Sequence, residues 1–134
     1  MKNSHLQGWI DRKLGRDALT ISFGATAESE HSKHAGPRWE YGKVAIQAEP
    51  SSDFRFTSKV IWPCAHFKMY EEMVLDGVLD VLICRSANPI LGVSVTLLEI
   101  GWHEVNSAPM FYYFAARTAM QKILDKPEIV SIVR

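Results

Sequence analysis

The sequence predicts an α+β domain, in which two helices pack on one face of a four- or five-stranded sheet. Three observations support this prediction. Several segments alternate apolar and polar residues, as half-buried strands do. Two other segments carry apolar residues at steps of three and four, as amphipathic helices do. The resulting order is β-β-β-α-β-α with a short last strand, and both helices must then cover the same face of the sheet in a two-layer domain.

Period-two alternation predicts the strands. In the segment 18–28, apolar Leu19 and Ile21 alternate with polar Thr20 and Ser22. The other strands are expected over 41–49, 54–61, 91–100 and, at the C-terminal end, 129–133.

Residues 29–38, between the first two strands, are polar and contain Gly36-Pro37, so a loop is expected there. The segment 31–43 has three cationic side chains against Glu40, which gives it a formal charge of +2. Its histidines can add to that charge.

Spacing of apolar residues predicts two helices. The first runs from about His66 to Ile83, with Gly77 as a weak point in its middle. The second runs from Pro109 to about Leu124. The expected buried face of the first helix comprises Phe67, Tyr70, Val74, Val78 and Val81. Its expected solvent-exposed face is acidic and comprises Glu71, Glu72, Asp76 and Asp80. The expected buried face of the second comprises Phe111, Phe114, Ala115, Thr118 and Lys122, with the two phenylalanines against the strand 91–100.

Length and composition indicate one domain over residues 18–134, preceded by a loosely held arm or edge element over 1–17. The 15 Lys and Arg balance the 15 Asp and Glu, which argues against nonselective binding of nucleic acid. Any RNA contact must therefore come from a local patch. No apolar run reaches the ~20 residues of a membrane span, and the N-terminus does not resemble a signal peptide. We therefore expect a cytoplasmic protein with no membrane contact.

Two segments carry a family resemblance. Residues 31–44 read H-S-K-H-A-G-P-R-W-E-Y-G-K-V, and residues 101–108 read G-W-H-E-V-N-S-A. Together they resemble the paired loop motifs of domain IV of elongation factor G. Further matches in the same order are Glu49-Pro50, Phe54-Arg55-Phe56, Trp62-Pro63, 89–93 and 126–129.

The resemblance implies that the two loops lie side by side at the tip of an elongated domain, which in the family contacts the tRNA–mRNA duplex and ribosomal RNA. It also implies a rare left-handed β-α-β crossover. His103 matches a tip histidine that assists translocation. The candidate RNA-binding residues are His31, Lys33, His34, Arg38, Trp39, Tyr41, Lys43, Trp102 and His103.

This chain departs from the family pattern at four tip positions. Pro37 and Trp39 stand where the family has glycines, and Glu104 and Asn106 where it has aspartates. The chain also has no GxxxxGK[ST] motif, so it carries no GTPase of its own. The expected protein is a free-standing, non-enzymatic module that binds the ribosome or structured RNA.

Other chemistry is weakly supported. His31 and His34 could meet at one metal, but no third ligand follows at a useful spacing. Cys64 and His66 lie close in sequence without a third catalytic group, and both Cys64 and Cys84 are interpreted as buried thiols in a reducing compartment. We therefore expect no catalytic residue, metal or cofactor. The alternative function is a protein–protein interaction module, either a homo-oligomer or the partner of a separate protein.

Overall fold

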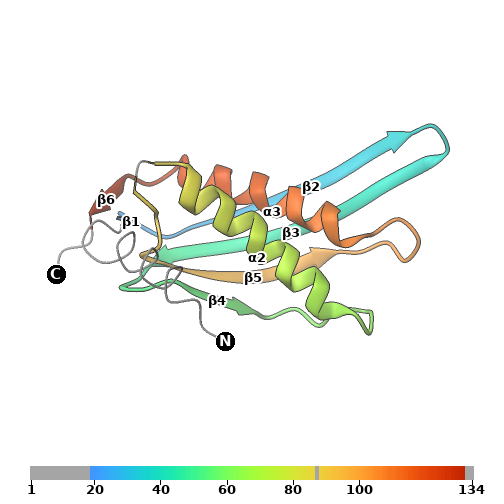
Figure 1. Ribbon diagram of the computed structural model, residues 1–134, viewed down its shortest axis with the longest axis horizontal. Helices are drawn as coiled ribbons and strands as arrows, with labels where there is room; N and C mark the ends of the chain where they lie inside the picture. Colours follow the sequence, from blue (N-terminus) through green and yellow to red (C-terminus); the bar gives the residue numbers. More distant parts are fainter. Residues whose placement is uncertain (1–18, 87, 132–134) are drawn as a thin grey trace, which may run out of the picture.

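The computed structural model describes residues 19–86 and 88–131 (Figure 1). The expected arm over 1–17 lies outside the described residues. In chain order the elements are β1 (Leu19–Ile21), β2 (Ala25–Ala35), β3 (Arg38–Pro50), β4 (Arg55–Ser58), α2 (Phe67–Cys84), β5 (Val93–Gly101), α3 (Pro109–Leu124) and β6 (Ile129–Ser131).

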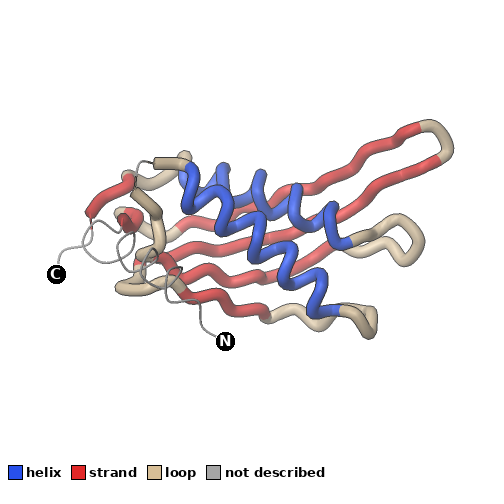
Figure 2. Tube along the Cα trace, viewed as in Figure 1, coloured by secondary structure: helices blue, strands red, loops and turns tan. Residues whose placement is uncertain are grey.

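The main sheet has four strands in the order β2-β3-β5-β4, and both helices cover one face of it (Figure 2). The α+β prediction is confirmed. β4 and β5 are parallel neighbours joined through α2, whereas the other pairs are antiparallel. In Figure 1 the helices lie in front of the sheet, β4 and β5 point to the right, and β5 lies above β4, so this crossover is left-handed, as the resemblance implies.

The chain ends of the described region form a second, small sheet. β1 pairs antiparallel with β6, and β1 is separated from β2 by a bend at Ser22 and Phe23. The prediction of one continuous strand over 18–28 was therefore wrong. Alternation persists across the bend, so the sequence pattern could not reveal that the two halves join different sheets.

The polar loop expected over 29–38 is instead the outer part of a β-hairpin. β2 and β3 pair in unbroken register from Ala25–Ala48 to Ala35–Arg38, and only Gly36 and Pro37 form the turn. Gly36 has a φ of 63°, a conformation that glycine adopts without strain. Figure 1 shows the hairpin reaching beyond the helices. Its outer residues are polar because water reaches both of its faces there, which removes the apolar alternation on which the prediction depended.

The core lies between the helices and the sheet. Val74, Val78 and Val81 of α2 are buried, as predicted, whereas Phe67 is 41% exposed. α2 runs through Gly77 without a break. A β-carbon at Gly77 would lie 2.6 Å from the Tyr113 carbonyl oxygen of α3, so glycine permits the close approach of the two helices.

The predicted buried face of α3 was wrong except at Ala115, which is buried as expected. Its buried residues are Tyr112, Ala115, Ala116, Ala119, Met120, Ile123 and Leu124. Phe114 is 38% exposed, and Phe111 is half-buried near Gly42 of β3. α3 has apolar residues on most of its circumference, so spacing alone could not select the buried side. The small alanines face the crowded interior, and the two phenylalanines lie at its edge.

Candidate functional site

The hairpin and the 101–107 loop meet at one end of the domain (Figure 1). The Tyr41 N–H donates to the Asn106 carbonyl at 3.1 Å. The rings of Trp39 and His103 lie 4.9 Å apart, edge to face, although 64 residues separate them in sequence. The expected side-by-side placement of the two segments is confirmed. We call this end of the domain the tip.

An aromatic row lies on the face of the hairpin that the helices do not cover. Val44, Ile46 and Ala48 point into the core, so Trp39 and Tyr41 point to the opposite, open face. The ring contacts along the row are His34–Trp39 at 5.6 Å, stacked, and Trp39–Tyr41 at 5.0 Å, tilted.

Local contacts hold this row in place. The Trp39 indole N–H donates to the Ser32 hydroxyl at 2.8 Å, which fixes the ring orientation. A β-carbon at Gly101 would clash with the Tyr41 hydroxyl, so glycine on β5 leaves the space that Tyr41 occupies. Sequence reasoning missed Ser32, although its pairing with Tyr41 follows once the hairpin is known.

The other face of the hairpin carries a different group. His31 lies on the helix side, stacked on Phe111 at 5.2 Å and tilted against Phe114 at 5.1 Å. Its Nε2 lies 3.1 Å from a Glu40 carboxylate oxygen, and its side chain is only 20% exposed. His31 thus joins the hairpin to α3, and its ring is largely occupied by protein contacts.

The cationic candidates divide between the two faces. Cross-strand pairing places Lys33 opposite Glu40 and Ala35 opposite Arg38, so Lys33 and Arg38 share the helix side and are exposed. Lys43 lies on the open face, where its amine is 3.8 Å from the Glu28 carboxylate. The nine candidates therefore do not form one continuous surface.

Trp102 lies apart from the aromatic row. Its ring is 5.0 Å from Tyr70, 6.0 Å from Tyr112 and 6.2 Å from Trp62, in a cluster packed against the core. The Trp102 ring therefore packs against the interior and does not belong to the aromatic row. In the same cluster, burial raises the pKa of Tyr112 to about 12.

A tight turn over 103–107 fixes the position of His103. The His103 carbonyl accepts the backbone N–H groups of Asn106 and Ser107 at 3.2 and 2.9 Å. The His103 N–H donates to the Ser107 hydroxyl at 2.9 Å. That hydroxyl also lies 3.2 Å from the buried Tyr112 hydroxyl, which donates to the Gly101 carbonyl at 2.7 Å. The histidine is therefore positioned by a turn that α3 supports.

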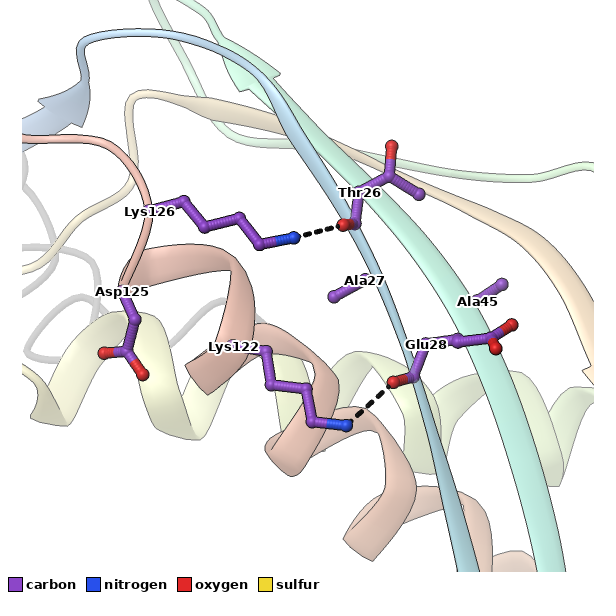
Figure 3. Close-up of a pocket in the computed structure, with 7 residues that line it drawn as sticks. All are labelled: Thr26, Ala27, Glu28, Ala45, Lys122, Asp125 and Lys126. Atoms are coloured by element: carbon purple, nitrogen blue, oxygen red, sulfur yellow. Dashed lines mark hydrogen bonds between the residues drawn. The ribbon is translucent and has the colours of Figure 1, made fainter.

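A groove opens along the outer edge of β2, away from the tip (Figure 3). There the Lys122 amine donates to the Glu28 carbonyl at 3.0 Å, and the Lys126 amine donates to the Thr26 carbonyl at 2.8 Å. Lysines so placed satisfy carbonyl groups of an edge strand and discourage strand addition. We assign this groove a structural role.

The weaker candidate sites gain no support from the geometry. His31 and His34 point to opposite faces of β2, so they cannot share a metal. No group of three or more potential ligands that could hold a metal occurs among the described residues. Cys64 is half-buried and Cys84 exposed, which corrects the expectation that both thiols are buried. In the described part of the chain, no hydrogen bond joins Cys64 to His66. None of the helices in residues 19–86 and 88–131 is both long and apolar enough to span a membrane.

Comparison with known proteins agrees with this fold. Elongation factor G of Fervidobacterium nodosum is 28% identical over 112 residues, which cover 80% of this chain and 16% of that protein. A crystal structure of a protein from Thermus thermophilus has a TM-score of 0.73 and 23% identity, over 84% of this chain and 17% of the other, and supports the fold. Residues 20–128 match the family described as elongation factor G, domain IV. With the four-stranded mixed sheet and its two helices, this match shows that the chain belongs to the elongation factor G domain IV family.

Proposed function

We propose that the tip binds structured RNA of the ribosome, either ribosomal RNA or the tRNA–mRNA duplex, as a non-enzymatic module. The observation that carries this proposal is the convergence of His34, Trp39, Tyr41 and His103 on one surface at the end of the domain. Family membership supports it, because the relative named above is an elongation factor. The chain has no P-loop motif, so the proposed binding needs no GTP hydrolysis by these 134 residues.

The chemistry of the tip suits RNA. Aromatic rings can stack on unpaired bases, and a ring held in place loses little entropy on binding. His34 is exposed at the end of the row, so its outer face offers the stacking surface, with Trp39 behind it. Lys33 and Arg38 are exposed on the other side of the same hairpin and can contact phosphates.

Co-sedimentation with ribosomes at low and high salt tests the proposal. The test variant replaces both Lys33 and Arg38 by alanine. Its matched control replaces Arg55 and Lys59, two exposed cations of the β4 region. We expect the wild type and the control to sediment with ribosomes at low salt, and the tip variant to remain in the supernatant. Absence of retention at low salt for the wild type contradicts the proposal.

The alternative is a protein-binding role, and one observation favours it. Three large apolar side chains before and at the start of α2 are exposed: Ile61 at 95%, Phe67 at 41% and Met69 at 56%. Figure 1 places this segment at the same end of the domain as the tip. Replacing Ile61 and Met69 by serine, which adds no charge, should leave RNA binding unchanged if the RNA proposal holds. Concentration-dependent association that these replacements abolish, together with no RNA binding, would favour the protein-binding role.

A further inference from the structure

The His103 ring meets two hydrogen-bond donors at the same nitrogen. The Asn106 backbone nitrogen, whose N–H is shared with the His103 carbonyl at 3.2 Å, lies 3.3 Å from Nδ1, and the Asn106 side-chain nitrogen lies 2.8 Å from it. The orientation of a side-chain amide can be reversed, but a backbone N–H is always a donor. Nδ1 must therefore act as an acceptor, and the proton of the neutral ring is on Nε2.

We propose that Asn106 is a positioning residue that holds the proton of the neutral His103 ring on Nε2, so that this ring meets RNA as an Nε2–H donor to a phosphate or ribose oxygen. This inference rests on the proposed function for its ligand but not for its proton placement. If the proton were on Nδ1, this N–H would face the two Asn106 donors, and both hydrogen bonds between Asn106 and the ring would be lost.

The surroundings of the ring agree with this assignment. Trp39 of β3 contacts the ring with an edge-to-face geometry. Ser107, which Tyr112 of α3 contacts, holds the backbone of His103 and not its ring. Among the described residues, no ion pair involves His103, and the charged side chain nearest in its own turn, Glu104, is exposed. Asn106 is therefore the residue that decides which ring nitrogen holds the proton.

Nitrogen-15 NMR of the histidine rings tests the proton placement without RNA. The His103 signals are assigned by their loss in His103→Gln. We expect the neutral ring of the wild type to be the Nε2–H form. A neutral ring in the Nδ1–H form would overturn the inference whether or not RNA binds.

Two variants test the role of Asn106. In Asn106→Asp, a carboxylate faces Nδ1 and should favour a proton there, so an Nδ1–H form should be detectable in this variant and not in the control. The control, Val105→Asp, adds the same charge in the same turn at a residue that is 84% exposed. The same ring tautomer in both variants would overturn the inference. If Asn106→Asp does not fold, Asn106→Ala replaces it. This variant keeps the backbone N–H but loses the side-chain donor, so the Nδ1–H fraction should rise above that of Val105→Ala without displacing the Nε2–H form. An unchanged Nδ1–H fraction would overturn the inference.

Measurements of RNA affinity separate this inference from the proposed function. His103→Gln should lower RNA affinity by about 2- to 10-fold, the loss expected for one neutral hydrogen bond. Replacing the RNA by a deoxyuridine-containing DNA of the same sequence distinguishes the acceptors, because the DNA keeps the phosphates and lacks the ribose hydroxyls. If the NMR results are as expected and neither nucleic acid binds, the proposed function is overturned while the proton placement stands.

Discussion

Gly77 sets the separation of α2 and α3. A β-carbon there would lie 2.6 Å from the Tyr113 carbonyl oxygen and 3.1 Å from the Ala116 side chain. Gly77→Ala gains about 1 kcal/mol of helix propensity but forces the helices apart, so we expect a net loss of about 1–2 kcal/mol in the free energy of unfolding. Urea denaturation measures this loss. The control Asp76→Ala, at an exposed position of α2, should be neutral or stabilising, and a stabilised Gly77→Ala would contradict the packing argument.

Tyr112 makes stability depend on pH in the alkaline range. Burial raises its pKa from 10.0 to about 12 in the folded state, so folding favours the protonated phenol. The stabilisation is fully present below pH 10 and is lost as the pH rises from about 10 to about 12, by roughly 2–3 kcal/mol. Tyr112→Phe removes this dependence and loses the hydrogen bond to Gly101, so it should be less stable than the wild type by about 1 kcal/mol at pH 9. The difference in unfolding free energy should shrink or reverse by pH 12, and a constant difference would contradict the prediction.

Single residues were predicted unevenly from the sequence. The three-and-four spacing correctly identified Val74, Val78 and Val81 as core residues, because the opposite face of α2 is charged. Nothing in the sequence explains Gly77, since its role depends on the backbone of another helix. Asn106 is visible in the sequence only as a departure from the family pattern, and its contact with His103 required coordinates.

At the scale of elements, the hairpin shows where periodicity loses information. Apolar alternation marks a strand only where one face is buried, and both faces of the outer hairpin meet water. A better signal was the pair of β-compatible segments around Gly36-Pro37, with Trp39 and Tyr41 at alternate positions. The strand 41–49 was predicted well because its inner residues, such as Val44 and Ile46, are fully buried.

The contact of His31 on the hairpin with Phe114 on α3, which we call the brace, should contribute moderately to stability. Phe114 is 38% exposed and covers His31, so Phe114→Ala should cost about 1–2 kcal/mol, less than a core aromatic. Tyr112→Ala, at a fully buried position of the same helix, is the comparison and should cost about 3–5 kcal/mol. Chemical denaturation of both variants measures the two losses. A loss at Phe114 as large as that at Tyr112 would mean that the brace belongs to the core.

At the scale of the whole molecule, the juxtaposition of the two tip segments was predicted by the family resemblance and by nothing else in the sequence. No periodicity relates Trp39 to His103, and the left-handed crossover opposes the usual rule for β-α-β units. The fold class followed from element order, since two amphipathic helices need a common apolar face. The split of the cations between two faces depends on hairpin register, which could not be predicted while residues 29–38 were assigned to a loop.

The split of the tip cations limits the salt dependence of RNA binding. Lys33 and Arg38 are exposed on one side of the hairpin, whereas Lys43 is engaged with Glu28 on the other. Two phosphate contacts, each contributing roughly 0.7–0.9, predict a slope of about −1.4 to −1.8 for log affinity against log salt concentration. Fluorescence anisotropy with a ribosomal RNA fragment over a series of salt concentrations measures this slope.

Variants of two arginines test whether the slope arises at the tip. Arg38→Ala should weaken binding and flatten the slope by about one unit, because it removes one of the two expected phosphate contacts. Arg55→Ala removes the same charge at β4, where Arg55 pairs with Asp53 at 3.2 Å, and should leave the slope unchanged. Equal effects of the two variants would show that binding follows the overall charge of the chain. A slope much steeper than about −3 in the wild type would require cations beyond the tip and would contradict a binding surface confined to it.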